Sequence, residues 1–298
     1  MNLALVAAAL VGVQVGSTMV ASDVIVSDVG TGFLAFLRYA IAVIVLLPFV
    51  RVKQLRAVAP RDLLPIAILG TAQFGALIAL LNTALLYTDP ARVTLVFSTL
   101  PLFTMIAESV IKRAWPDPIA AIAIALTLAG IVCMIGVDAF AGSVNARDGI
   151  GLGAVFLATL CGAVSAVFYR PYLDRYGALP ISVLAMGASL IPLGLLALIE
   201  GTGVSPASWP VLAFWLIAFL GLASGIGYYL LLFALSRADP SSVTAFFALA
   251  PITAAVLSVW LLATPLAPGV YPAILLVSAG LFVLSRHRNA TVPPRGHF

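Results

Sequence analysis

Apolar residues occur along this sequence in long uninterrupted runs, separated by short polar connections. A run of 18 or more apolar residues with few charges predicts a transmembrane helix, because about 20 residues cross the hydrocarbon core of a bilayer. Outer-membrane strands alternate polar and apolar residues over about ten positions, which these runs do not do. The sequence therefore predicts an all-α membrane protein with ten transmembrane helices, at residues 2–20, 31–50, 62–86, 91–111, 118–137, 150–169, 178–198, 210–236, 241–262 and 268–286.

The composition agrees with this interpretation. Hydrophobic residues make up 63% of the 298 positions, charged residues make up 9%, and the mean hydropathy is +1.17. Soluble domains are roughly 45–50% apolar and about 25% charged. Ten helices use most of the chain, so we expect no folded soluble domain beside them.

The basic residues predict the orientation of the chain. Two of them, Arg92 and Arg147, fall in the connections after odd-numbered helices, and Arg38 lies inside a span. The connections after even-numbered helices and the C-terminal tail hold the other twelve: Arg51, Lys53, Arg56, Arg61, Lys112, Arg113, Arg170, Arg175, Arg237, Arg286, Arg288 and Arg295. Cytoplasmic loops carry the excess of Lys and Arg, so we expect a multi-pass inner-membrane protein with both termini in the cytoplasm. This distribution explains the net charge of +4 without a nucleic-acid partner.

The first run could be mistaken for a secretory signal peptide. Only Met1 and Asn2 precede it, so it lacks the positively charged start of such peptides. We therefore interpret residues 2–20 as a retained transmembrane helix.

The sequence repeats itself with a shift of 150 residues. Ala84-Leu85, Asp89-Pro90, Val93-Thr94, Phe97 and Pro101 recur as Ala234-Leu235, Asp239-Pro240, Val243-Thr244, Phe247 and Pro251. Proline and glycine matches carry the most weight, since Leu, Ala and Val match often by chance in apolar segments. We infer a first five-helix repeat at 1–145, a second at 146–288 and a disordered tail at 289–298. A duplicated unit with an odd number of helices places its second copy upside down, so the two repeats should be inverted.

Inverted repeats are typical of secondary transporters, which place the substrate site at the repeat interface near the bilayer midplane. The sequence resembles the EamA-type, ten-helix branch of the drug/metabolite transporter superfamily. This resemblance rests on the Asp-Pro connections, on the central prolines, on Leu128-Ala129-Gly130 with Ser278-Ala279-Gly280, and on Leu37-Arg38-Tyr39. It implies a carrier that works by alternating access, and it suggests the activity of the superfamily's bacterial aromatic amino-acid exporters.

Two prolines and two phenylalanines are candidates for the substrate path. Pro101 and Pro251 fall near the middle of the fourth and ninth helices, where proline removes a backbone hydrogen bond and kinks the helix. We expect kinks or gating points there, with Phe97 and Phe247 as flat apolar walls of a cavity. The alternative is that the prolines bend helices only for packing and that the phenyl rings fill the core.

Polar side chains at membrane depth tend to face a cavity or the bundle interior. Gln14, Asn82, Ser165 and Tyr228 are the polar candidates for substrate binding. Hydroxyl groups have a common alternative, which is to bond carbonyls of their own helix. For Gly12 and Gly16, which form a GxxxG pattern, we expect close helix packing rather than substrate contact.

Arg38 is the one basic residue well inside a span. It could bind a substrate carboxylate, or it could pair with Asp23 or Asp28 in the preceding connection. We favour the structural ion pair, because long cationic side chains reach toward the membrane interface.

Several chemistries have no candidate residues. No Asp or Glu falls in the middle of a predicted span, and both histidines, His287 and His297, lie in the tail. The sequence therefore predicts no enzyme, no cofactor, no metal site and no phosphate-binding loop for ATP.

These observations favour a secondary transporter that moves a small amphipathic metabolite, with export of aromatic or apolar amino acids as the leading interpretation. Its expected partners are the small-molecule substrate and the lipid bilayer, and we expect a monomer or a homodimer. The alternatives are a facilitator or exporter of another metabolite or drug, such as a nucleoside or a cationic compound, and a channel-like pore. An intramembrane enzyme lacks the required residue pairs, and a sensor lacks a soluble effector domain.

Overall fold

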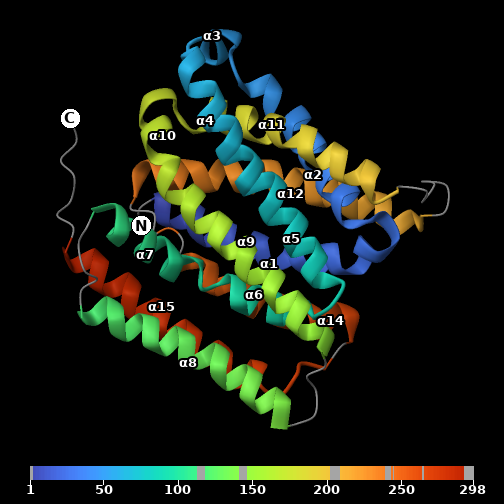
Figure 1. The fold of residues 1–298 in the computed structure, drawn as a ribbon, viewed down its shortest axis with the longest axis vertical. Coiled ribbons are helices and arrows are strands. Elements are labelled where there is room, and N and C mark those ends of the chain that lie inside the picture. Colours follow the sequence, from blue (N-terminus) through green and yellow to red (C-terminus); the bar gives the residue numbers. More distant parts are fainter. Residues whose placement is uncertain are drawn as a thin grey trace.

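In a computed structural model, the chain folds into a bundle of α-helices (Figure 1). The structure describes residues 3–112, 118–140, 146–201, 209–238, 243, 245–263 and 265–291. No β-strand occurs in these ranges, so the prediction of an all-α fold is confirmed for them.

Over its described residues, the first half of the chain contains eight α-helices, one 3-10 turn and one π-helical segment. They are α1 (Leu3–Val29), α2 (Thr31–Leu46), η1 (Leu47–Phe49), α3 (Val52–Arg56), α4 (Pro60–Gly70), the π-helical η2 (Thr71–Ala76), α5 (Leu77–Leu85), α6 (Pro90–Phe97), α7 (Leu100–Lys112) and α8 (Pro118–Phe140).

The second half contains α9 (Ala146–Phe168), α10 (Arg170–Tyr176), α11 (Ala178–Ile199), α12 (Val211–Arg237), the 3-10 turn η4 (Ala245–Ala248), α14 (Leu249–Leu262) and α15 (Val270–Thr291).

Many of these helices are long and apolar enough to cross a membrane. Within the described ranges seven stretches meet that criterion: Leu3–Val29, Thr31–Phe49, Pro60–Leu85, Pro90–Ile111, Arg147–Phe168, Ala178–Ile199 and Val211–Arg237. The helices Leu249–Leu262 and Val270–Gly280 are apolar but shorter. The count of ten spans stays a prediction.

The outer surface of the bundle is apolar. Trp260 is 84% exposed and Ile199 is 81% exposed. Large exposed apolar side chains over several helices are expected where the solvent is the hydrocarbon core of a bilayer.

The two ends of the bundle are easily recognised. At one end, here called the Gly30 end, α1 turns into α2 through Gly30, whose φ of 89° favours glycine. The opposite end, called the α3 end, holds α3 and α10 (Figure 1). The first predicted span was too short at this turn, because Asp23 and Asp28 belong to α1, which continues to Val29.

Helices related by the 150-residue shift run in opposite directions. Helix α1 ends at the Gly30 end, whereas α9 begins there, with Asp148 bonded to Arg92 near the start of α6. The same holds for α2 and α11: α2 begins beside Glu200, which directly follows the last residue of α11.

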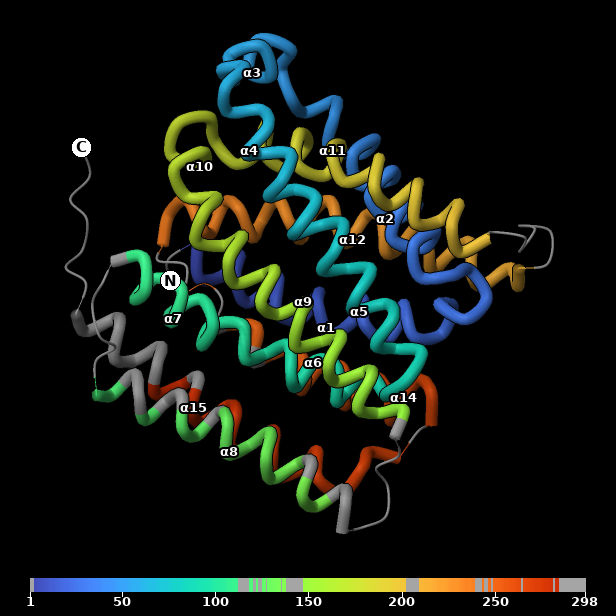
Figure 2. Tube along the Cα trace, viewed as in Figure 1, coloured from blue at the N-terminus to red at the C-terminus, as the bar shows by residue number. Residues whose placement is uncertain are grey.

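The contacts between helices also occur in equivalent pairs. Helix α1 packs on α12 and α14, and its equivalent α9 packs on α5 and on α7. Helices α2 and α11, which are equivalent to each other, also pack together. Helices α8 and α15 are a second such pair, and they lie side by side along one flank of the bundle (Figure 2).

The fourth and ninth predicted helices are interrupted at equivalent positions. Helix α6 ends at Phe97, and α7 begins at Leu100, just before Pro101. In the second half, the 3-10 turn η4 precedes α14, which contains Pro251 as its third residue. Because proline has no backbone N–H, the α-helical hydrogen-bond ladder cannot run through either position.

Glycines set the closest contacts of α1. A Cβ atom on Gly12 would lie 2.2 Å from the backbone oxygen of Phe246, and one on Gly16 would lie 2.4 Å from that of Ala250. The expected packing role of this GxxxG pattern is thus what the structure shows.

Candidate substrate-binding cavity

A cavity lies in the centre of the bundle, between helices of both halves. Its volume is about 30 Å³, which is room for one or two water molecules. Pockets that hold small-molecule ligands are usually about 300–1,000 Å³. The cavity in this structure is therefore too small to hold a ligand of that size.

The cavity combines polar groups with aromatic walls. Its polar side chains are Gln14, Thr18, Arg38, Gln73, Tyr169 and Tyr228. Phe74, Phe97 and Phe247 supply aromatic surface, and leucines and valines supply most of the rest. None of the residues that line this cavity is acidic.

Helix α1 contributes Gln14 and Thr18, which are one turn apart on the same face. The Thr18 hydroxyl donates to the carbonyl of Val15 at 3.1 Å, which is the ordinary alternative for a hydroxyl in a helix. The Gln14 amide lies against Gly227 of α12, where an added Cβ would come within 2.5 Å of its Oε1. Gly227 thus leaves the space in which the Gln14 amide lies.

The π-helical segment η2 contributes Gln73 and Phe74. Each π-turn has one more residue than an α-turn, so such a segment changes which side chains face inward, and it often occurs at functional sites. Gln73 is 8% exposed, and its Oε1 has no hydrogen-bond partner. Sequence reasoning missed both residues, because an apolar run gives no signal of a π-turn.

Arg38 of α2 is buried at the cavity, with 2% of its surface exposed. Its Nε donates a short hydrogen bond to the Ser224 hydroxyl of α12. Its Nη1 is buried and has no hydrogen-bond partner. The favoured pairing with Asp23 or Asp28 is wrong, because Arg38 points into the bundle and makes no ion pair with any residue in the described part of the chain.

Two aromatic clusters form walls of the cavity. The rings of Phe97 and Phe247, which are separated by the repeat shift of 150, meet edge to face with centroids 5.7 Å apart. Phe74 packs edge to face on Tyr228 at 4.7 Å and on Tyr39 at 5.3 Å. Such aromatic pairs contribute about 0.5–1.5 kcal/mol beyond the area that they bury.

The other predicted site residues lie elsewhere. Asn82 is fully buried, but its Nδ2 donates to the carbonyl of Thr31 at 3.0 Å, so it joins α5 to the start of α2 and does not line the cavity. Ser165 is buried, and its hydroxyl has no partner, but it is not one of the lining residues. Pro101 and Pro251 begin the helices that follow Phe97 and Phe247, without lining the cavity themselves.

Polar contacts join the two halves at both ends of the bundle. At the α3 end, Arg175 and Tyr176 of α10 both donate to Asp62 of α4, with an Arg175 distance of 2.7 Å. At the Gly30 end, Glu200 accepts from the Gly32 N–H at 2.8 Å and from the Thr31 hydroxyl.

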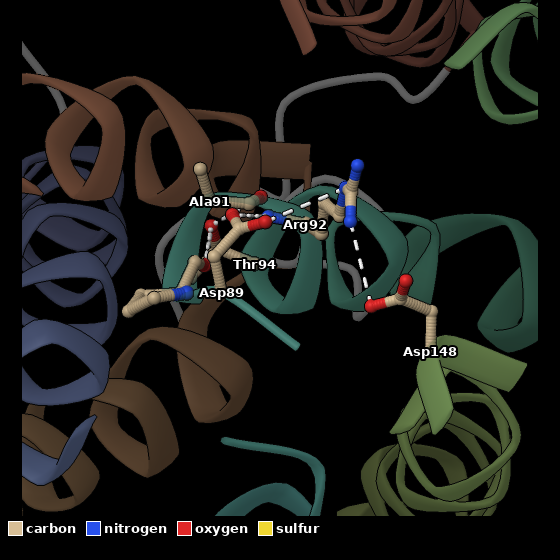
Figure 3. A network of polar contacts seen from close by, with 6 residues as sticks. Asp89, Ala91, Arg92, Thr94 and Asp148 are labelled. Atoms are coloured by element: carbon tan, nitrogen blue, oxygen red, sulfur yellow. Dashed lines mark hydrogen bonds and ion pairs between the residues drawn. The ribbon is translucent and has the colours of Figure 1, made fainter. Parts of the chain in front are cut away.

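A second network lies at the Gly30 end (Figure 3). Asp89 caps α6 by accepting from the backbone N–H of Arg92 at 2.9 Å, and the Arg92 side chain lies 3.4 Å from both Asp89 and Asp148. Burial raises the pKa of Asp89, although the bonds from Arg92 partly oppose this effect. Arg92 and Asp148 are 7% and 4% exposed, so the α6–α9 contact is a buried ion pair.

The sequence profile of the EamA-like transporter family matches residues 2–136 and again residues 149–286. The chain belongs to the EamA-like transporter family. It contains two EamA repeats and is a multi-pass membrane transporter, which agrees with the expectation that it is not an enzyme.

Other comparisons concern the fold. A solved crystal structure, described only as that of a protein, has 20% sequence identity to this EamA-like transporter and a TM-score of 0.69, over 96% of this chain and 99% of the other. At this identity the likeness shows a shared fold alone. A search among curated proteins found no match.

Proposed function

We propose that this EamA-like transporter is a secondary carrier that moves a small amphipathic metabolite by alternating access, and that it exports aromatic or apolar amino acids. The observation that carries the proposal is the central cavity, where amide, hydroxyl and guanidinium groups face phenyl and phenol rings. A phenylalanine-like solute has matching parts, namely charged groups at one end and an apolar ring at the other.

The arrangement of the helices supports alternating access. Equivalent helices run in opposite directions and make equivalent contacts, as expected for two inverted five-helix repeats over 1–145 and 146–288. The Phe97–Phe247 pair lies where the repeats meet. Each end of the bundle is bridged by polar contacts between the halves, so each end has its own gate.

The distribution of charge supports an orientation in the inner membrane. Basic residues gather in and around α3 and α10, including Arg51, Lys53, Arg56, Arg170 and Arg175. The α3 end is then cytoplasmic, with both chain termini on that side.

The alternatives make different predictions about the cavity. A cationic drug is disfavoured, because Arg38 lines the cavity and no acidic residue does. A nucleoside exporter or a channel-like pore remains as a competing function for the same bundle. The protein is proposed to act as a monomer or a homodimer.

Counterflow in proteoliposomes tests the proposal. Vesicles preloaded with unlabelled phenylalanine should transiently accumulate labelled phenylalanine above equilibrium, because a carrier couples the return of one molecule to the entry of another. Gln14→Ala should reduce this accumulation, and Gly153→Ala, in a position with open space around it, should not. A flux that does not saturate and does not respond to substrate on the other side would contradict the carrier mechanism.

A further inference from the structure

The cavity contains a positive charge without a negative partner. Arginine stays protonated in proteins, and Arg38 is 2% exposed. Its observed hydrogen bond goes to the neutral Ser224 hydroxyl, and its Nη1 has no partner. A buried charge without a partner is costly, by several kcal/mol per ion in general terms.

Other buried polar atoms beside the cavity also lack partners. They are Oε1 of Gln73 and the hydroxyl of Tyr169, both on lining residues. Buried polar groups in proteins are nearly always bonded, so these atoms indicate a ligand that completes the site. The guanidinium and the Tyr169 phenol can donate to an acceptor-only anion such as a carboxylate, whereas Oε1 of Gln73 is an acceptor and suits a donor such as an amino group.

The cavity offers an ammonium group only neutral partners. None of its lining residues is acidic. Phe97, Phe247 and Tyr228 offer ring faces, which attract a cation by about 0.5–2 kcal/mol, and Oε1 of Gln73 is a neutral acceptor. An amino group on the substrate is therefore tolerated rather than required.

We propose that Arg38 binds the carboxylate of the transported molecule, so that the preferred substrate class is a monocarboxylate with an aromatic or bulky apolar end. This proposal deepens the proposed function and rests on it. Gln73 and Tyr169 complete the polar end of the site, and the aromatic clusters contact the apolar end. A phosphate ester carries more negative charge than one arginine neutralises, so the site should prefer monocarboxylates to phosphorylated metabolites.

A series of matched competitors tests the requirement for the carboxylate in the unaltered protein. The probes share a phenyl ring: phenylalanine, 3-phenylpropionate without the amine, phenethylamine without the carboxylate, and phenylalanine amide with a neutral amide in its place. Unlabelled 3-phenylpropionate should inhibit counterflow of labelled phenylalanine about as well as phenylalanine itself. Phenethylamine and the amide should be at least tenfold weaker. Equal inhibition by phenethylamine would overturn the proposal.

A variant of Arg38 links the preference to this residue. Arg38→Gln should raise the KM for phenylalanine at least tenfold and should remove the discrimination between 3-phenylpropionate and phenethylamine. Arg51→Gln, which removes an exposed charge at the α3 end, is the matched control and should keep both. If Arg38→Gln does not fold, Arg38→Lys, which keeps the positive charge, should keep the preference for 3-phenylpropionate over phenethylamine with a raised KM, and a lysine variant with unchanged KM would overturn the assignment to Arg38.

Two further outcomes are decisive. If chloride or sulfate alone protects the protein against thermal unfolding as well as 3-phenylpropionate does, the site binds small inorganic anions and the carboxylate proposal is wrong. If phenylalanine counterflow is observed but does not depend on the carboxylate, the inference about Arg38 fails while the proposed function stands. If no probe in the series shows counterflow, the proposed function itself fails.

Discussion

Substitution of Gly12 by alanine is expected to destabilise the bundle through a single added methyl group. The new Cβ would lie 2.2 Å from the backbone oxygen of Phe246 and 3.2 Å from the Cβ of Leu249. Cβ atoms essentially never come closer than 3.0 Å to such neighbours. Helix α1 and η4 must therefore move apart by about 0.8 Å, and the atom in the way is backbone, which cannot rotate aside.

The size of the effect follows from two opposing terms. Overpacking costs about 1–3 kcal/mol, and we take about 3 kcal/mol because the clash is with backbone. Replacement of a helical glycine by alanine returns about 1 kcal/mol of helix propensity. The expected net loss is about 2 kcal/mol, which corresponds to a fall of roughly 3 °C in Tm for a chain of this length.

Two other glycines make the experiment specific. Gly187 of α11 has open space around its Cβ position, so Gly187→Ala should leave Tm unchanged or raise it. Gly162 is the repeat equivalent of Gly12, but its Cβ would meet only the ends of the Leu100 and Leu77 side chains, at 2.7 and 2.9 Å. Gly162→Ala should therefore cost less than Gly12→Ala.

The assay is thermal unfolding of the purified protein in detergent, followed by the loss of the monodisperse peak in size-exclusion chromatography. If Gly12→Ala melts within 1 °C of the unaltered protein while Gly187→Ala behaves as expected, the close approach of α1 to η4 is not a feature of the protein in solution.

Three further variants test the cavity and the Gly30 end. Phe247→Ala should raise the KM for labelled phenylalanine about tenfold, which is about 1.4 kcal/mol of lost apolar contact, and an unchanged KM would place the ring outside the substrate path. Asp148→Asn should lower the free energy of unfolding by about 3 kcal/mol, because it leaves Arg92 with one carboxylate fewer. A double-mutant cycle with Arg92→Met that gives no coupling energy would show that the Arg92–Asp148 ion pair is not formed. Asp89→Asn keeps a capping oxygen and should flatten the pH dependence of Tm. Because burial raises the pKa of Asp89, the unaltered protein loses stability as pH rises through the titration of this carboxyl group. Equal slopes of Tm against pH for both proteins would refute the raised pKa of Asp89.

Much of the fold could be predicted because bilayer physics restricts the choices. Long apolar runs in lipid must be helical, and the recurrence of proline and glycine with one shift identified the repeat. Phe97 and Phe247 were expected only as walls of a cavity; that their rings meet fits the same shift, since residues near a pseudo-twofold axis meet their own equivalents. The extent of α1 was less predictable, because Asp23 and Asp28 resemble loop residues but continue the helix.

The polar end of the cavity was harder to predict. Whether Arg38 turns toward the membrane interface or into the bundle depends on Ser224, which lies 186 positions away in sequence. Their polarity at membrane depth made Gln14 and Asn82 equal candidates for substrate binding, but the neighbours of each residue decide its role. Gln14 lies at the cavity in the space left by Gly227, whereas Asn82 donates to a backbone carbonyl. Gln73 reaches the cavity from a π-helical turn that has no sequence signature.

The most direct test of the central claim is the accessibility of one cavity residue from both sides of the membrane. The experiment places a cysteine at Gln14 in a chain whose own cysteines, Cys133 and Cys161, are replaced by alanine. A membrane-impermeant thiol reagent is then applied to one side or the other of oriented vesicles, with and without saturating phenylalanine. Alternating access predicts that Gln14→Cys reacts from either side and that phenylalanine changes both rates. Reaction from one side only, under every condition, would contradict the account.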